Sequence, residues 1–263
     1  MEIKLLESDS KNNKTSFILS KTTPSFANTI RRTVLEEVPV MAIEDVEFKQ
    51  NSSILYDEII AHRLGLLPLK TDLKSYNLPS KCKCKGAGCA RCQLKLSLKS
   101  KGDMVYASDI VSKDPKIKPV YPNTPIVKLL KGQKVELEAT ACLGQGKEHA
   151  KWSPGLVFYK YKPIIEIGKN IKHPDAIVKS CPVGVFEIKG NRLVINDKNL
   201  FKCHLCQNCT DICPAIKLTE SENDFVFYVE SWGQLSCKEM LVTAANILQE
   251  KLNEFNTKLK ELK

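Results

Sequence analysis

The 263-residue sequence has no long apolar run of the kind that a membrane-spanning helix needs. Crossing a bilayer takes about 20 consecutive apolar residues, and no stretch of this chain approaches that length. The opening segment, MEIKLLESDSKNNK, also lacks the basic, apolar and small-residue regions of a secretory signal peptide. We therefore expect a cytoplasmic protein.

The chain also lacks the sequence motifs of common enzyme classes. It has no GxGxxG dinucleotide motif, no flavin signature, no phosphate-binding loop and no carboxylate cluster that would hold catalytic magnesium. His62 has no nucleophile or second base at a recognisable spacing, so we expect it to pack or to form hydrogen bonds in the core. Asp57 and Glu58 fall at the start of a predicted helix, where acidic side chains are common. The chain is therefore not expected to be catalytic on its own.

The sequence does have an excess of positive charge. It contains 40 Lys and Arg residues against 30 Asp and Glu residues, a formal net charge of +10. Such a balance favours acidic partners or nucleic acid. Because the lysines are scattered rather than clustered, an ordinary solvated surface explains the charge as well. A basic nucleic-acid-binding module is one alternative for the function.

The cysteines are the strongest signal, since eleven of them in a cytoplasmic chain indicate metal more often than disulfides. The run CHLCQNCTDICP has the spacing of a bacterial ferredoxin. In two-cluster ferredoxins the last cysteine of such a run serves the other cluster, so a fourth ligand is expected upstream, at Cys181. We predict one iron–sulfur cluster, 4Fe-4S or 3Fe-4S, held by Cys181, Cys203, Cys206 and Cys209.

Cys213 is left over from this ligand set and could be a free thiol, a disulfide partner or an alternative ligand. A zinc site and a disulfide-linked remnant are the alternatives to a cluster. Because the chain has no other redox motif, we interpret the cluster as structural, with metal binding contributing to folding. The alternative function is a single-cluster ferredoxin-type electron-transfer or redox-sensing protein.

A second cysteine group lies in the segment KCKCKGAGCARCQ. Its four thiols, Cys82, Cys84, Cys89 and Cys92, have a spacing that suits tetrahedral zinc. Two disulfides or an empty loop are the alternatives. The isolated Cys142 and Cys237 are expected to pack as small hydrophobic residues.

Several elements can be placed from local patterns. KTSFILS predicts a strand, and Thr23 followed by Pro24 predicts the start of a helix that Pro39 terminates. VFEIKGNRLVI predicts a hairpin that turns at Gly190 and Asn191. The stretch YKYKPIIEIGKNIKHP predicts a domain boundary near residue 165, and the cysteine module follows it.

The C-terminal segment predicts a long helix with an apolar seam. Apolar residues recur there in alternating steps of four and three, which is a heptad pattern: positions 241, 245, 248, 252, 255, 259 and 262. A seam this long and narrow favours packing against the helix of a partner over packing on the same domain. With an N-terminal helix it predicts a dimer interface of Phe26, Ile30, Val34, Leu241, Leu248, Leu252, Phe255 and Leu259.

Residues 26–69, FANTIRRTVLEEVPVMAIEDVEFKQNSSILYDEIIAHRLGLLPL, carry a family resemblance. The segment resembles the signature of the alpha-type assembly subunits of RNA polymerase. Together with the cysteine loop, the ferredoxin-like run and the terminal helix, it is most similar to the archaeal members of this family, the counterparts of the eukaryotic third-largest polymerase subunit.

The resemblance implies an α+β fold in which a discontinuous alpha-like dimerisation domain carries inserts. The dimerisation domain would comprise residues 1–40 and 225–263, a mixed α/β insert domain residues 41–165, and a ferredoxin-like iron–sulfur module residues 166–224. It also implies a non-catalytic scaffold that forms a heterodimer with the small subunit L. Subunits N and P and the large catalytic subunits would then join, and nucleic acid would be met only through the whole complex. Arg31 and Arg32 would lie at subunit contacts.

Overall fold

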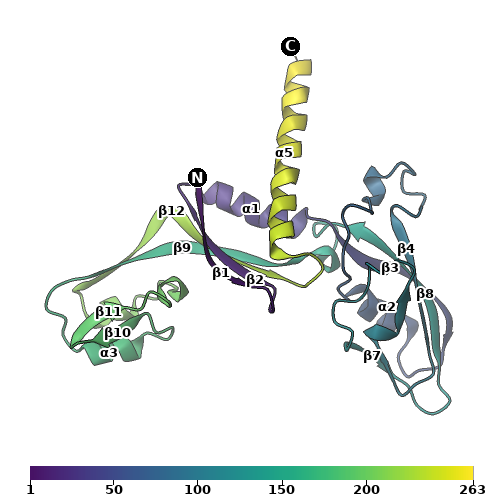
Figure 1. Cartoon of the computed structure of the whole chain (residues 1–263), viewed down its shortest axis with the longest axis horizontal. Coiled ribbons are helices and arrows are strands. Elements are labelled where there is room, and N and C mark those ends of the chain that lie inside the picture. Colours follow the sequence, from purple (N-terminus) through teal and green to yellow (C-terminus); the bar gives the residue numbers. More distant parts are fainter. Residues whose placement is uncertain (263) are drawn as a thin grey trace. The chain divides into compact units, whose positions relative to one another are not determined.

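The computed structural model describes residues 1–262. This part of the chain is a mixed α/β structure with five α-helices and twelve strands (Figure 1). Four short 3₁₀ helices complete it, at Pro79–Lys81, Ala107–Asp109, Ala150–Trp152 and Leu200–Lys202. The chain forms two compact units. Unit 1 joins Met1–Ser8, Thr15–Thr29 and Phe158–Tyr228, and unit 2 joins Asp9–Lys14, Ile30–Val157 and the segment from Val229 onward.

Unit 1 is built on most of a four-stranded sheet with the order β1-β2-β12-β9. Its strands are β1 (Glu2–Asp9), β2 (Lys14–Ser20), β9 (Gly155–Ile167) and β12 (Ile216–Ser231). The predicted strand KTSFILS is β2, so that prediction is confirmed. Aromatic side chains fill this part of the core, where the rings of Phe17 and Phe227 stack with centroids 5.1 Å apart.

The boundary predicted near residue 165 lies inside a strand, since β9 continues to Ile167. The proline in this stretch suggested a linker. However, β9 is at the edge of the sheet, where the missing N–H of Pro163 is tolerated. The chain leaves the sheet only after Ile167.

The cysteine module of unit 1 follows β9. It comprises α3 (Pro174–Ser180), the hairpin of β10 (Phe186–Lys189) and β11 (Arg192–Ile195), and α4 (Asn208–Ile212). Gly190 and Asn191 have φ values of 53° and 65°, the conformation that a two-residue hairpin turn requires. This confirms the predicted hairpin. Buried Ile177, Phe186 and Ile216 form a small core together with three of the cysteines.

Helix α1 (Pro24–Glu36) begins where the sequence predicted. The backbone N–H of Phe26 donates to Oγ1 of Thr23 at 3.3 Å, so Thr23 caps the helix as expected. The helix ends three residues before Pro39.

Unit 2 contains a second four-stranded sheet with the order β3-β8-β4-β6 (Figure 1). Its strands are β3 (Val40–Asn51), β8 (Val135–Gly144), β4 (Gln93–Ser100) and β6 (Ile110–Ser112), and a small sheet pairs β5 (Met104–Tyr106) with β7 (Pro125–Lys128). Helix α2 (Asp57–Gly65) contacts β3 and contributes Ile60 and Leu64 to the core. His62 is exposed, so the prediction that it packs in the core is wrong. It is two residues from both buried positions and therefore points away from them.

Helix α5 (Cys237–Glu261) is the longest helix of residues 1–262. It begins before the predicted heptad seam because Ser236 and Glu239 form a reciprocal capping box. Its first turns bury Cys237, Met240 and Ala244, whereas every residue from 249 to 262 is exposed. None of the helices in residues 1–262 combines the length and apolar character needed to span a membrane.

Candidate metal centres and partner surface

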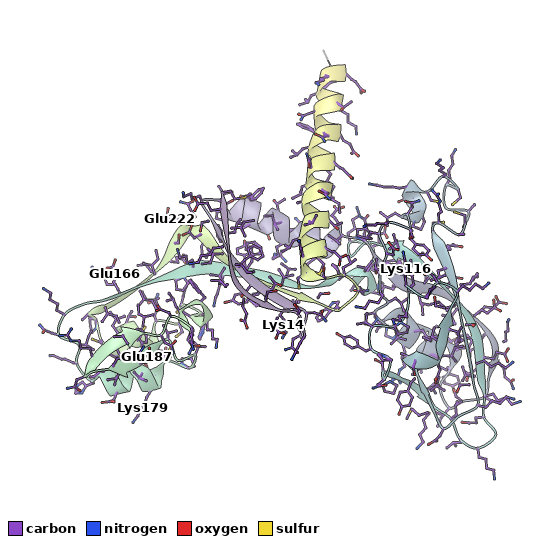
Figure 2. All side chains as sticks on the ribbon, in the orientation of Figure 1. Lys14, Lys116, Glu166, Lys179, Glu187 and Glu222 are labelled. Atoms are coloured by element: carbon purple, nitrogen blue, oxygen red, sulfur yellow. The ribbon has the colours of Figure 1, made fainter. Side chains whose placement is uncertain are left out.

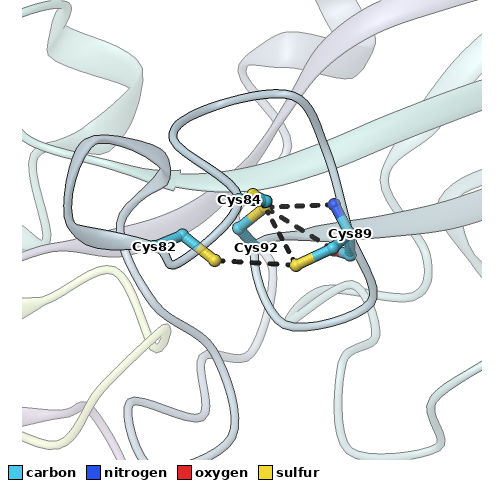
Figure 3. A group of neighbouring side chains, drawn as sticks. All are labelled: Cys82, Cys84, Cys89 and Cys92. Carbon is cyan, nitrogen blue, oxygen red and sulfur yellow. Dashed lines mark hydrogen bonds between the residues drawn. The ribbon is translucent and has the colours of Figure 1, made fainter.

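Cys82, Cys84, Cys89 and Cys92 come together on one loop that precedes β4 (Figure 3). The Sγ atoms of Cys82 and Cys89 are 3.5 Å apart, and so are those of Cys84 and Cys92. The Sγ atoms of Cys89 and Cys92 are 3.7 Å apart. All four sulfur atoms lie within 4.8 Å of one another, in a loop that buries Cys82 and Cys92.

Glycine lets the chain make this loop. Gly86 and Gly88 have φ values of 87° and 90°, which L-residues with side chains rarely adopt. A Cβ atom on Gly88 would also lie only 2.5 Å from Oε1 of Gln93. The backbone N–H groups of Gly86 and Gly88 donate toward Cys84. The loop therefore directs donors as well as thiols to its centre.

The sulfur positions fit a tetrahedral metal ion. With Zn–S bonds of about 2.3 Å, the thiolates of a tetrahedral zinc site are about 3.8 Å apart, close to the distances found here. Disulfide sulfurs are about 2.05 Å apart, so these pairs are not disulfides. Hydrogen bonds from Cys92 and then Cys82 hold the pKa of Cys84 well below its usual range, whereas burial raises the pKa of Cys92 to about 12. This tetra-cysteine group could bind a metal ion.

The cysteine module places Cys181, Cys203, Cys206 and Cys209 around one small pocket. Most of its other lining is apolar, from Ile165, Val183, Val185, Phe186 and Leu218. Within residues 1–262, only the Cys82 group brings three or more metal-ligating atoms within 4.8 Å of one another. The sulfur atoms around the pocket of the cysteine module are therefore farther apart than those of the Cys82 group.

The remaining three cysteines are buried outside both candidate ligand sets. Cys213 is 4% exposed and does not line the pocket, although its backbone N–H donates to the carbonyl of Cys209. Cys142 and Cys237 are buried as small hydrophobic residues, as predicted, and burial raises the pKa of Cys142 to about 11. All eleven cysteines fall within residues 1–262, and each of them is a free thiol there.

The predicted partner surface on α5 is largely uncovered. Leu252, Phe255 and Leu259 are 62%, 59% and 44% exposed, and Leu241 and Leu248 are half-buried. Figure 2 shows the side chains of the C-terminal turns of α5 pointing outward around the helix. Exposed apolar residues at heptad spacing are typical of a helix that packs against another chain.

The residues assigned to α1 divide into two groups. Phe26 is 40% exposed and Ile30 is half-buried, so both are accessible. Val34 is fully buried within the chain, which corrects its assignment to the dimer interface. It follows Ala27 by two helical turns on the inner face of α1. Arg32 forms an ion pair with Glu36 at 3.0 Å, one turn along the same helix.

One contact at the cysteine module was not predicted from the sequence. Nζ of Lys160, on β9, donates to the carbonyl of Cys203 at 2.7 Å. The pair is separated by 43 residues, and no local pattern in YKYK distinguishes this lysine from its neighbours.

Known proteins resemble the chain over its full length. It is 40% identical over 267 residues to the DNA-directed RNA polymerase subunit Rpo3 of Methanosarcina acetivorans, a match that covers 100% of this chain and 99% of that protein. The chain belongs to the Rpo3 family of DNA-directed RNA polymerase subunits. The Rpo3 protein of Archaeoglobus fulgidus is 40% identical over 265 residues, covering 99% of this chain and 98% of that protein. The Rpo3 protein of Pyrococcus furiosus is 38% identical over 268 residues, a match that covers 100% of this chain and 98% of that protein.

A family model also matches part of this Rpo3 chain. Residues 44–155 match the RNA polymerase Rpb3/RpoA insert domain, a region that includes most of β3, all of α2 and the Cys82 loop. The resemblance to RNA polymerase assembly subunits is therefore confirmed. Since these relatives are named as polymerase subunits, an electron-transfer protein is not favoured.

Proposed function

We propose that this chain is a non-catalytic assembly subunit of DNA-dependent RNA polymerase. It pairs with the small alpha-like subunit L through α5 and the accessible residues of α1. The heterodimer then binds subunits N and P and the large catalytic subunits. In this role the chain works in the cytoplasm and meets nucleic acid only through the complete complex.

The exposed seam of α5 is the observation that carries the proposal. A fully buried Leu or Phe side chain contributes about 1.5–3 kcal/mol relative to an exposed one, so three exposed seam residues leave several kcal/mol for a partner. A facing helix with its own heptad of apolar residues would cover them.

In this role the chain has three domains. Residues 1–40 and 225–263 form a discontinuous dimerisation domain, residues 41–165 form an insert domain, and residues 166–224 form an iron–sulfur module. The match of an insert-domain model to residues 44–155 supports the insert domain of this division. Arg31 and Arg32 lie on α1, and their planar guanidinium groups suit contacts with carboxylates of another subunit.

Two metal centres stabilise the proposed scaffold. Zn²⁺ is held by Cys82, Cys84, Cys89 and Cys92, whose sulfur distances suit one tetrahedral ion. One iron–sulfur cluster, 4Fe-4S or 3Fe-4S, is held by Cys181, Cys203, Cys206 and Cys209. The wider spread of these sulfurs around an apolar pocket suits a group larger than a single ion.

The test of the scaffold role replaces one seam residue and measures pairing. Leu252→Glu places a charge in the proposed helix–helix interface, which costs roughly 3 kcal/mol or more and weakens pairing at least about a hundredfold. The measurement is co-purification and titration calorimetry of the full chain with subunit L. Bound zinc and iron should not change, because residue 252 is in neither cysteine group.

Thr257→Glu is the matched control, because Thr257 is exposed on the face of α5 opposite the seam. It introduces the same charge into α5 and should leave pairing unchanged. Equal pairing of both variants would refute the interface, and equal loss in both would show that any added charge on α5 disrupts the chain.

A further inference from the structure

Lys160 contacts the backbone of Cys203, one of the residues that line the cysteine pocket of unit 1. Its Nζ donates to the carbonyl of Cys203 at 2.7 Å and lies 5.4 Å from the ring centroid of Tyr228. The side chain is half-buried. The lysine is therefore a partly desolvated cation beside a predicted iron ligand.

No carboxylate in residues 1–262 forms an ion pair with Lys160. Lys162 has the same orientation on the strand, two residues further along β9, and its Nζ is paired with Asp224 at 3.1 Å. A desolvated charge without a counter-ion is unfavourable. The four thiols of the pocket, which must lose their protons to bind a metal, would then supply the compensating negative charge.

Tyr228 holds the same loop from the neighbouring strand. Its hydroxyl donates to the carbonyl of Phe201 at 2.5 Å, and its ring stacks on Phe158 with centroids 4.9 Å apart. Side chains of β9 and β12 thus fix two carbonyls, those of residues 201 and 203, at the start of the ligand run. The sheet positions Cys203 through backbone contacts.

We propose that Lys160 is the counter-cation of the cysteine pocket and that Lys160 and Tyr228 together position the loop carrying Cys203. This inference rests on the proposed iron–sulfur cluster. A cluster held by Cys181, Cys203, Cys206 and Cys209 would be anionic, and one-electron reduction by dithionite would add one further negative charge. The ammonium group of Lys160 therefore stabilises the reduced cluster more than the oxidised one.

The experiment uses the full chain, reconstituted anaerobically with ferrous iron and sulfide. Lys160→Met removes the charge at similar length, and Lys160→Gln removes it but keeps an N–H donor. Lys162→Met is the matched control, because it removes a paired lysine from the same strand. The measurements are iron and sulfide per chain, the midpoint potential in a dithionite titration, and the rate of iron loss to a chelator.

Lys160→Met should shift the reduction equilibrium about tenfold toward the oxidised cluster, which is about 59 mV for a one-electron couple. It should also lose iron several-fold faster than the unmodified chain. Tyr228→Phe keeps the charge, so it should lose iron faster at an unchanged potential. Lys162→Met should match the unmodified chain in both measurements.

Two results overturn the inference, and they are distinguishable. If the unmodified chain takes up no iron–sulfur cluster, both the proposed cofactor and the role of Lys160 fail. If the cluster forms but Lys160→Met and Lys162→Met have the same potential and the same iron loss, only the role of Lys160 fails. Should Lys160→Met not fold, Lys160→Gln decides: an unchanged potential overturns the counter-cation role, and a shifted one supports it.

Discussion

The two cysteine groups each offer four thiols, but the chain assembles them differently. The first group comes from a single loop, Cys82 to Cys92, and its nearest sulfurs are 3.5–3.7 Å apart. The second joins Cys181 to a run that begins at Cys203, and a hairpin separates the two segments. Its sulfurs surround an apolar pocket.

The difference shows how the backbone selects the size of a cofactor. A short loop with two glycines in left-handed conformations can bring four sulfurs to the spacing of one tetrahedral ion. A pocket built from two segments, with its own small core, holds the thiols farther apart and suits a cluster. Four predictions test this comparison, in order of decreasing expected effect.

Replacing one cysteine ligand in either group should abolish binding of that group's metal and leave the other metal bound. Cys92→Ala should abolish zinc binding and leave iron, whereas Cys209→Ala should abolish the cluster and leave zinc. Structural zinc contributes about 10–16 kcal/mol of binding free energy in small zinc domains, so loss of a buried ligand has a large effect. Elemental analysis of the purified chain measures both metals.

Cys142→Ala is the control for this pair, since Cys142 is buried and belongs to neither group. It should retain zinc and iron. A loss of both metals in Cys92→Ala would mean that the two centres are not independent.

Removal of zinc should make the Cys82 loop sensitive to protease and leave the iron module unchanged. Chelation of zinc should increase tryptic cleavage at Lys83, Lys85 and Arg91 by at least about tenfold, because the metal contributes to folding of that loop. Cleavage at Lys189 and Arg192, beside the hairpin turn, should not change. Mass spectrometry of the fragments identifies the sites, and cleavage at the hairpin upon zinc removal would contradict the prediction.

Replacing Cys181 or Cys213 tests which thiol is the fourth ligand of the cluster. Cys181→Ala should give a three-iron cluster or none, because Cys181 lines the pocket. Cys213→Ala should keep iron content and the electron paramagnetic resonance spectrum, since Cys213 does not line it. The opposite pattern would assign Cys213 as the ligand.

Gly88→Ala should weaken zinc binding by about tenfold and leave iron unchanged. A residue with a side chain at φ 90° costs about 1–2 kcal/mol, and the added Cβ would press on the side chain of Gln93. Zinc affinity is measured by competition with a chromogenic chelator. Gly190→Ala, in the hairpin turn of the iron module, is the reciprocal control and should leave zinc affinity unchanged.

Local sequence predicted those features that depend on neighbouring residues. The Thr23 cap, the turn at Gly190 and the strand KTSFILS were found because capping, turn geometry and alternation act over a few residues. Local sequence did not show that β9 runs through residue 165, because the edge position of this strand, which accommodates Pro163, depends on the order of strands in the sheet. His62 and Val34 were misassigned because the buried face of a helix is set by what packs against it.

The sequence by itself determined the family, the two sets of four cysteines and the heptad seam, since each is written in residue type and spacing. Only the tertiary structure decided which thiols share a pocket, that Cys213 is outside it, and that Lys160 lies against Cys203. It also decided that α5 buries its first turns and exposes its last. These outcomes depend on contacts between residues that are distant in the chain, and such contacts are fixed by the packing of whole elements rather than by any local pattern.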